Sequence, residues 1–360
     1  MHDRELFEKA FSPLHASPDT LTEVRKTMRN EKKTRRALGK SAVVAIAAAL
    51  TLTIAVAGGI VTLIRADVSP ADKVDDTTHH AFTDDLDATT PTVDDGKGTA
   101  VSVPDMERIP GDIQTTQRLV GQYLSKLDAE MTVDSNTIKL GTFLIDENGL
   151  GLLTYSVENP SGVGYTDVGY GEGIDLPLQP TLHFRSPDEG NALFAKCYVD
   201  KETSTDTCLN VVLYFAAGTS FRQGDLLYVT MQDELGQPYS IAVQPRTYVP
   251  VATLTSGSET LTLSPLGMSI RNAHPDREPL VDELTLRYQD GSEFTVESSS
   301  RSLMNWVVGC MRGSDDVPFA DNTYVFDRLV DVDAVSSVTL EGHQHTDGAA
   351  DDTFTLTYQP

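Results

Sequence analysis

Residues 42–64 read AVVAIAAALTLTIAVAGGIVTLI, a run of 23 residues that contains no charged side chain. As an α-helix with a rise of about 1.5 Å per residue, this run is about 35 Å long, which is enough to cross the hydrocarbon core of a bilayer. Its Thr and Gly residues are tolerated in such a helix, because lipid forces the backbone to keep its hydrogen bonds internal. The sequence therefore predicts one transmembrane helix at residues 41–64.

The charge of the chain changes sign across this run. The whole sequence has 28 Lys and Arg against 53 Asp and Glu, a net charge of −25, yet residues 1–40 carry +4, which leaves −29 for the remainder. Basic residues concentrate on the cytoplasmic side of membrane helices, so we expect a cytoplasmic N-terminus and an extracytoplasmic C-terminal part. The sequence pI of about 4.5 argues against a nucleic-acid partner.

A cleaved signal peptide is the alternative interpretation of this run. Ala55-Val56-Ala57 supplies a small-residue cleavage site of the A-x-A kind. A basic region of 40 residues before the run, and apolar residues that continue to Ile64, fit a retained anchor better.

The cytoplasmic segment, residues 1–40, has the pattern of two short amphipathic helices. Ser17-Pro18 is typical of a helix start, and Leu21, Val24 and Met28 then form one apolar stripe. Helices this short build no core of their own, so the stripes require a protein partner or lie on anionic membrane lipid. The sequence leaves both options open.

The string Asp3-Arg4-Glu5-Leu6-Phe7, together with Phe11, residues 14–21, a basic stretch and a single span, resembles the N-termini of anti-sigma-factor-like membrane proteins of low-GC Gram-positive bacteria. The resemblance covers residues 3–64. It implies that the cytoplasmic segment holds an extracytoplasmic-function sigma factor, and that the docking residues are Phe7, Phe11, Leu14, Leu21 and Val24. The segment contains His2 and His15 but no Cys, which excludes the zinc-stabilised domain that many anti-sigma factors use.

Residues 65–112 are rich in Asp, Thr, Pro and Ala and poor in large apolar residues. This composition predicts an acidic, disordered linker. His79-His80 lies among four Asp residues and could bind a divalent metal, but loop composition alone explains the pair more simply, so we predict no metal and no cofactor.

The remainder is predicted to be mainly β. Residues 113–248 form a first domain, with a helix capped by Asp112 over residues 113–127, a hairpin of residues 142–145 and 150–157, and strands at residues 192–199, 209–215, 226–231 and 239–243. Residues 249–360 form a second domain with strands at residues 261–263, 268–271, 284–288, 294–296, 335–340 and 354–358. The turn Asp290-Gly291, between the third and fourth of these strands, is a strong hairpin signal. Short strands joined by Gly- and Pro-rich connections favour two β-sandwich-like domains.

Two further strings extend the resemblance to this outer part. Residues 263–268 (LSPLGM), and residues 326–333 (FDRLVDVD) with residues 337–340 (SVTL), are similar to the uncharacterised extracytoplasmic sandwich domains that accompany such N-termini.

Three cysteines follow the apolar run. Cys197 and Cys208 fall on successive predicted strands, so we predict a disulfide between them, with a reduced pair as the alternative. Cys310 lies among apolar neighbours and is expected to be a packing residue. The Gly-rich stretch 162–173 carries Tyr165 and Tyr170 and predicts a flexible loop, or a contact surface for a wall polymer or peptide.

No nucleophile elbow, HExxH helix or phosphate-binding glycine loop occurs in the sequence, so we expect no catalytic residues and no enzymatic activity. A hydrolase built on His343 and His345 is the minor alternative. The predicted function is that of a single-pass anti-sigma-factor-like regulator that senses an envelope ligand through its outer domains. The competing function is a cell-surface binding or adhesion protein with a simple membrane anchor.

Overall fold

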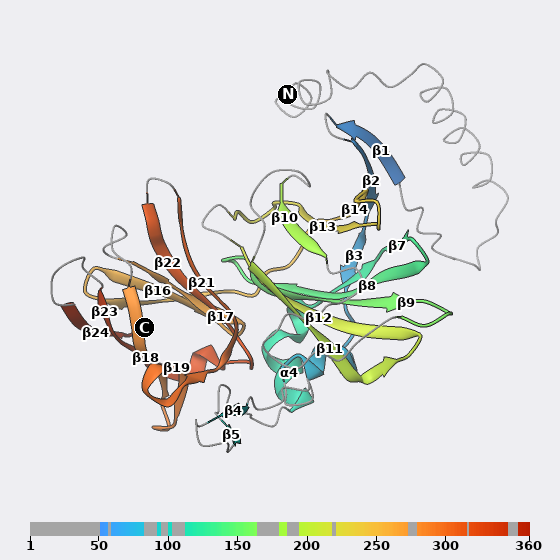
Figure 1. Cartoon of the computed structure of the whole chain (residues 1–360). Coiled ribbons are helices and arrows are strands. Elements are labelled where there is room, and N and C mark those ends of the chain that lie inside the picture. The colour runs from blue at the N-terminus through green and yellow to red at the C-terminus, as the bar shows by residue number, and fades with distance from the viewer. Residues whose placement is uncertain are drawn as a thin grey trace, which may run out of the picture. The chain divides into compact units, whose positions relative to one another are not determined.

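The computed structural model describes residues 51–56, 59–82, 92–94, 100–102, 112–163, 180–185, 194–217, 221–272, 279–314, 317–344 and 352–360. The cytoplasmic segment, with its five predicted docking residues, and the first part of the predicted membrane helix lie outside the described residues. The described part is mainly β and is built from several antiparallel or mixed sheets (Figure 1).

The first sandwich has two sheets in its described residues. One has the strand order β1-β2-β14-β13-β10, with bounds Thr51–Val56, Gly59–Arg65, Pro238–Val243, Leu227–Gln232 and Thr181–Phe184. The other has the order β11-β12-β9-β8-β6-β3, with β7 also paired to β8, and bounds Phe194–Thr205, Cys208–Ala216, Leu150–Glu158, Asn136–Ile145, Ser125–Asp128, Asp67–Pro70 and, for β7, Glu130–Val133. Buried apolar residues of both sheets form one core between them.

The second sandwich is built in the same way. One sheet has the order β15-β16-β17-β22-β21, with bounds Ala252–Ser256, Glu259–Ser264, Gly267–Arg271, Val317–Phe326 and Trp306–Ser314. The facing sheet has the order β20-β19-β18-β23-β24, with bounds Leu303–Met304, Glu293–Ser298, Pro279–Tyr288, Val335–Gln344 and Asp352–Tyr358. A second core, which includes Leu263, Phe294 and Phe326, fills the space between these sheets.

A third apolar cluster lies on the other face of the seven-stranded sheet. Along β12, Val211 and Leu213 face the core of the first sandwich, whereas Val212 and Tyr214 face this third cluster. Side chains alternate between the two faces of a strand, so both faces of β12 are buried. Val307 and Val325 of the second sandwich belong to the same cluster, which therefore packs the two sandwiches against each other.

Two short helices lie beside this third cluster: α4 (Ile113–Val120) contributes Val120 to it, and α3 (Asp76–His80) is flanked by its members Val74, Ala81 and Phe82. The side chain of Asp112 accepts hydrogen bonds from the backbone N–H groups of Gln114 and Thr115, so the predicted N-cap is confirmed. The predicted helix over residues 113–127 is too long. After α4 the chain makes a 3-10 turn, Gly121–Tyr123, and then enters β6, where Leu127 is buried in the first core.

The structure has strands where the apolar run predicts a membrane helix. Thr51–Val56 pairs with Gly59–Arg65, and β2 pairs in parallel with β14, Ile64 opposite Ile241. The sequences TLTIAV and GIVTLI are rich in Thr, Ile and Val, which favour strands, and Gly58-Gly59 is a dipeptide common in hairpins. In the described part of the chain, no helix has both the length and the apolarity needed to cross a membrane.

The prediction of a disordered linker over residues 65–112 is wrong for residues 65–82. Asp67–Pro70 pairs with β6, and α3 follows with Val74, Ala81 and Phe82 buried in the third cluster. These few apolar side chains are enough to hold the segment, because they fit a surface that later strands build. The short strands β4 (Thr92–Asp94) and β5 (Ala100–Ser102) pair with each other. Residues 83–91, 95–99 and 103–111 lie outside the described residues.

Most strands predicted from the sequence are present. The hairpin of β8 and β9 and the pairs formed by β11 with β12 and β13 with β14 lie where the pattern predicts them. In the second sandwich, the predicted turn at Asp290-Gly291 joins β18 to β19, with Gly291 at φ +87°. The pattern missed β10, β21 and β22, among others.

Candidate functional site

The turn between β8 and β9 lies where the first sandwich meets the second. It consists of Asp146-Glu147-Asn148-Gly149, and Gly149 adopts φ +82°, which a residue with a Cβ rarely does. The Oδ1 atom of Asp146 accepts hydrogen bonds from the backbone N–H groups of Asn148 at 2.9 Å and of Leu150 at 2.8 Å. The turn is therefore held by a side chain of its own.

Asp146 also binds the second sandwich. Its Oδ2 atom accepts a hydrogen bond of 2.7 Å from the Oγ of Ser264, which lies at the end of β16. Asp146 is fully buried, and the loss of water raises the pKa of its carboxyl to about 7, although the hydrogen bonds from Ser264 and the turn favour the charged form. The junction thus contains a carboxyl that changes charge near neutral pH.

Beside this turn, three strands of the second sandwich present a polar surface, here called the platform. Alternate residues of β16, β17 and β22 face away from the sandwich core: Thr260 and Thr262, Ser269 and Arg271, and Asp321 and Thr323. Thr262 is paired with Ser269, Ser269 with Thr323, and Arg271 with Asp321. The intervening residues, such as Leu261 and Ile270, are buried in the core.

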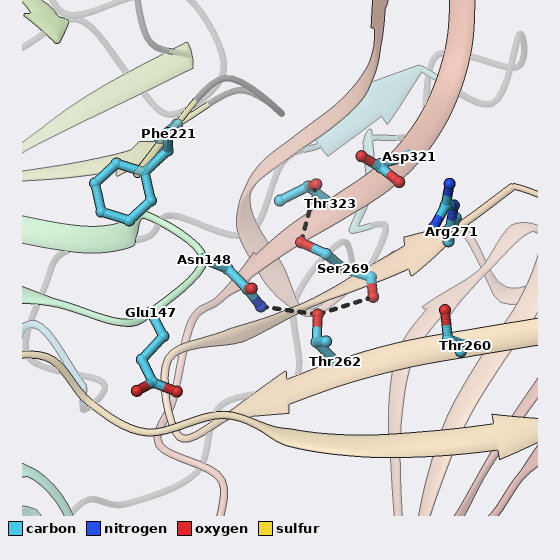
Figure 2. Close-up of a pocket in the computed structure, with 10 residues that line it drawn as sticks. Glu147, Asn148, Phe221, Thr260, Thr262, Ser269, Arg271, Asp321 and Thr323 are labelled. Atoms are coloured by element: carbon cyan, nitrogen blue, oxygen red, sulfur yellow. Dashed lines mark hydrogen bonds between the residues drawn. The ribbon is translucent and has the colours of Figure 1, made fainter. Parts of the chain in front are cut away.

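The platform forms one side of a pocket of about 300 Å³. Glu147 and Asn148 of the β8–β9 turn, together with Ala217 and Phe221, form the other side. Figure 2 shows the side chain of Phe221 across the pocket from the platform, with Thr262, Ser269 and Thr323 linked on adjacent strands. This volume is at the lower end of the range for small-molecule sites, about 300–1,000 Å³.

Hydrogen bonds fix the hydroxyl groups of the platform. The Nδ2 group of Asn148 donates to the Oγ1 of Thr262 at 2.8 Å, and that hydroxyl donates to the carbonyl oxygen of Ser269 at 3.3 Å. The hydroxyls of Ser269 and Thr323 lie 3.2 Å apart. The lining thus offers hydroxyl groups, one amide, one guanidinium and the carboxylates of Glu147 and Asp321, and it contains neither His nor Cys.

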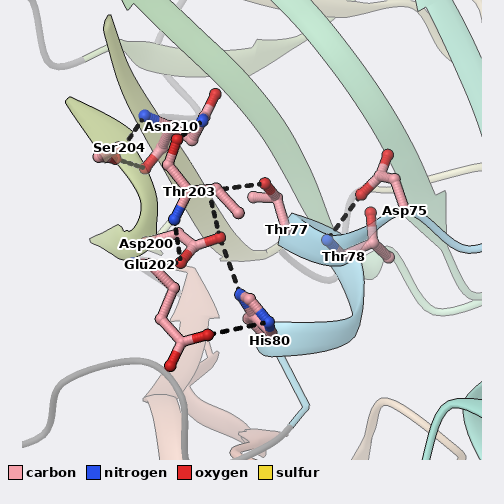
Figure 3. Close-up of polar contacts among 9 residues, drawn as sticks. All are labelled: Asp75, Thr77, Thr78, His80, Asp200, Glu202, Thr203, Ser204 and Asn210. Carbon is pink, nitrogen blue, oxygen red and sulfur yellow. Dashed lines mark hydrogen bonds and ion pairs between the residues drawn. The ribbon is translucent and has the colours of Figure 1, made fainter.

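A separate polar cluster holds α3 on the seven-stranded sheet (Figure 3). The Nδ1 atom of His80 lies 3.0 Å from Oδ2 of Asp200, which is fully buried on β11, and Nε2 of His80 lies 3.7 Å from the carboxylate of Glu202. Thr203 donates its hydroxyl hydrogen bond to the same Oδ2 atom. The hydroxyls of Thr77 and Thr203 lie 3.2 Å apart.

This cluster revises the interpretation of His79-His80. His80 is packed against a carboxylate from another part of the chain, so it is not a linker residue. No group of three or more His, Cys, Asp or Glu with a metal-binding arrangement occurs within the described ranges. The sequence could not pair His80 with Asp200, since 120 residues separate them and neither has a motif.

The predicted disulfide is wrong. All three cysteines are free, and the register places Cys197 opposite Leu213 and Cys208 opposite Thr205. Leu213 and Cys208 are five residues apart on one strand, about 17 Å at the usual rise, whereas the Cα atoms of a disulfide lie within about 7 Å. Cys208 begins its strand right after the hairpin turn, whereas Cys197 lies far from it.

The remaining candidate residues have these positions. Cys310 is half-buried at the edge of the third cluster, in line with a packing role. The Nδ1 atom of His343 lies 3.0 Å from Oδ2 of Asp282, and His345 lies outside the described residues, as do Tyr165 and Tyr170. The five predicted sigma-docking residues, Phe7, Phe11, Leu14, Leu21 and Val24, also lie outside them.

In comparisons with protein-family models, with curated proteins and with solved structures, none was found to match this chain.

Proposed function

We propose that this chain is a membrane-anchored, anti-sigma-factor-like regulator. Its cytoplasmic segment holds an extracytoplasmic-function sigma factor, and its outer β domains sense the envelope. The observation that carries the proposal is the N-terminal arrangement: a basic segment with two apolar stripes, the run of 23 uncharged residues, and then an acidic remainder. This order is typical of an N-in, C-out membrane protein.

The geometry of residues 66–82 supports the sensing part of the proposal. These residues directly follow the apolar run, and they are held on the first sandwich by the pairing of β3 with β6 and by the contact of His80 with Asp200. A rearrangement of the outer domains therefore acts on the chain next to the span. In this mechanism, an outer signal loosens the segment, and the cytoplasmic helices release their partner.

A membrane anchor at residues 42–64 is incompatible with the strands β1 and β2. An open sheet edge cannot lie in hydrocarbon, because its backbone N–H and C=O groups would lack partners, whereas a helix satisfies them internally. The proposal therefore requires that residues 51–65 leave the strands β1 and β2 in a bilayer and form a helix together with residues 42–50. Both forms use the same backbone groups, so they exclude each other.

Capture of a partner by the full chain tests the proposal. The wild-type protein in solubilised membranes is compared with a variant in which Phe7, Phe11, Leu21 and Val24 are all changed to Ala. We expect the wild type to retain one sigma factor from native cytoplasm and the variant to lose it, because the changes remove the apolar stripes and leave the charge unchanged. If the wild type retains no sigma factor, the regulator proposal fails.

The second candidate is a cell-surface binding protein in which residues 1–40 only anchor and orient the chain. The pocket beside the β8–β9 turn supports this candidate, because a cell-surface binding protein needs a ligand site in its outer part. A gene for a sigma factor next to the gene for this chain is expected only for the regulator.

A further inference from the structure

We propose that the pocket beside the platform binds a neutral saccharide. The inference deepens the proposed function by naming the ligand class of the outer domains, and its biological role rests on that function. The binding itself depends only on the described residues of the two sandwiches.

The lining determines the polarity of the ligand. Ala217 and Phe221 are the apolar residues among the ten that line the pocket, and the others carry hydroxyl, amide, carboxylate or guanidinium groups. An apolar ligand would leave these polar groups without water or a partner, at a cost of about 1–3 kcal/mol for each group that is buried. A ligand with many hydroxyls suits them, because each hydroxyl both donates and accepts.

The charges of the lining argue against an anion. Arg271 is the cationic residue of the pocket, and it lies directly opposite Asp321 across the pair β17–β22. Glu147 adds a second carboxylate, so the lining has two negative charges and one positive charge. Phosphate or a carboxylate ligand needs an excess of donors and positive charge, which this pocket lacks. A neutral ligand avoids electrostatic repulsion by the carboxylates of Glu147 and Asp321.

Phe221 supplies the surface that a sugar ring needs. One face of a pyranose ring carries C–H groups that pack on an aromatic ring, while its hydroxyls point to the rim. Phe221 is held by two aromatic neighbours, with its ring centroid 4.9 Å from that of Phe184 and 6.3 Å from that of Tyr248. The platform opposite then faces the hydroxyls of the sugar (Figure 2).

The platform is also ordered before any ligand arrives. Thr262 is oriented by Asn148, and Ser269 and Thr323 are oriented by each other. These side chains belong to paired strands, so little conformational entropy is lost when they bind a ligand. The site therefore has a preformed set of donors and acceptors on a rigid base.

Calorimetric titration of the full chain tests the inference. The protein is kept in a detergent without a sugar headgroup, and the probes are a glucose trisaccharide, an N-acetylglucosamine trisaccharide and inorganic phosphate. We expect at least one trisaccharide to bind with a Kd of about 1 mM or lower, and phosphate to show no binding. The two trisaccharides distinguish a storage-type glucan from a wall-type amino-sugar polymer as the source.

A variant and a matched control connect the binding to the pocket. In the double variant Thr323→Val with Arg271→Met, one hydroxyl and the guanidinium are removed while most of the side-chain volume remains, and we expect Kd to rise at least about tenfold. The control, Thr285→Val with Arg287→Met, makes the same changes on β18, outside the pocket, and we expect an unchanged Kd.

The inference is overturned if neither trisaccharide binds with a Kd of about 1 mM or lower, if phosphate competes with the sugar, or if the double variant binds as the control does. Capture of a sigma factor by the cytoplasmic segment does not involve the pocket. Failure of the sugar titration with successful capture therefore refutes this inference alone, and the reverse pattern refutes the regulator.

Discussion

The Oδ2 atom of Asp146 lies 2.7 Å from the Oγ atom of Ser264, and this buried hydrogen bond joins the β8–β9 turn of the first sandwich to the end of β16 in the second. The same carboxyl holds its own turn through two backbone N–H groups. One titratable side chain thus fixes both the shape of the turn and the junction beside the pocket.

Asp146 is expected to make the stability of the protein depend on pH. Burial raises the pKa of its carboxyl from 3.8 to about 7, so the folded state binds the proton more tightly than the unfolded state. Its contribution to the free energy of unfolding is therefore largest below about pH 4 and falls as the pH rises to about 7, by about 4 kcal/mol at most.

Asp146→Asn removes this dependence, because the amide is neutral at every pH. The difference in free energy of unfolding, variant minus wild type, should rise between about pH 4 and 7 in urea titrations. Asp290→Asn is the control, because hydrogen bonds from Ser292 lower the pKa of Asp290 below its usual value of 3.8. For this variant the difference should stay flat between about pH 4 and 7, and it should fall with rising pH only below about pH 4. Parallel curves for Asp146→Asn and wild type would contradict the assignment.

The contact between His80 and Asp200 is expected to hold the segment that follows the apolar run. His80→Ala leaves a fully buried carboxylate without its imidazole partner, so we expect a loss of about 2–4 kcal/mol and faster amide exchange over residues 76–82. His343→Ala removes a similar 3.0 Å contact to Asp282, whose side chain is 46% exposed, and should cost less than about 1 kcal/mol. Equal losses in the free energy of unfolding of the two variants would show that burial of the carboxylate does not determine the strength of these contacts.

Much of the β architecture follows from sequence patterns, because strands with alternating or continuous apolar residues are visible locally. The hairpin of β8 and β9 and the turn at Asp290-Gly291 are examples. The strands β21 and β22 were not predicted. In β21, Gly309, Cys310 and Met311 interrupt the alternation of apolar and polar residues, and the pairing of β21 with β22 is visible only in the structure. The predicted helix over residues 113–127 was too long because an apolar residue at position 127 fits a helix or a strand. The pairing of β6 with β8 places Leu127 in a strand.

The candidate site could not be predicted from the sequence. Its platform depends on the register of β16, β17 and β22, and its other side includes a turn more than 100 residues earlier in the chain. No local spacing of residues in the sequence therefore indicates this site. Thr and Ser in strands are common, and only their alignment on one face gives them a shared role. The disulfide prediction failed for the same reason, because it depended on a register that the sequence does not specify.

Gly267 is predicted to be indispensable at the start of β17. A Cβ there would lie 2.1 Å from the carbonyl oxygen of Tyr324 and 2.9 Å from Cδ1 of Leu150, which belongs to the other sandwich. Because the backbone of β17 or β22 would have to shift to make room for the Cβ, Gly267→Ala should lower the free energy of unfolding by about 1–3 kcal/mol or more in urea denaturation. Gly257→Asn, at φ +64° in an open turn, should change it little. A neutral Gly267→Ala would contradict this close packing.

The three thiols are predicted to differ in reactivity. Cys197 is buried, and burial raises the pKa of its thiol to about 12, whereas Cys208 and Cys310 are half-buried. Alkylation of the native protein followed by mass spectrometry should modify Cys208 before Cys197, because the thiolate is the reactive form and must be accessible. After unfolding without a reductant all three should react. A chain that then resists alkylation at Cys197 and Cys208 would carry the disulfide that the register excludes.

The apolar run decides between the membrane helix that we propose and the strands β1 and β2. Ile54 lies near the centre of residues 42–64, where an Arg in a membrane helix costs about 2.5–3.5 kcal/mol. Ile54→Arg should therefore move a large part of the full chain from the membrane fraction to the soluble fraction. Leu63→Arg, one residue before the end of the run, is the matched control and should stay in the membrane, because a long basic side chain near a helix end reaches the interface. If the wild-type chain is itself recovered in the soluble fraction, β1 and β2 are the physiological form and the anchor is refuted.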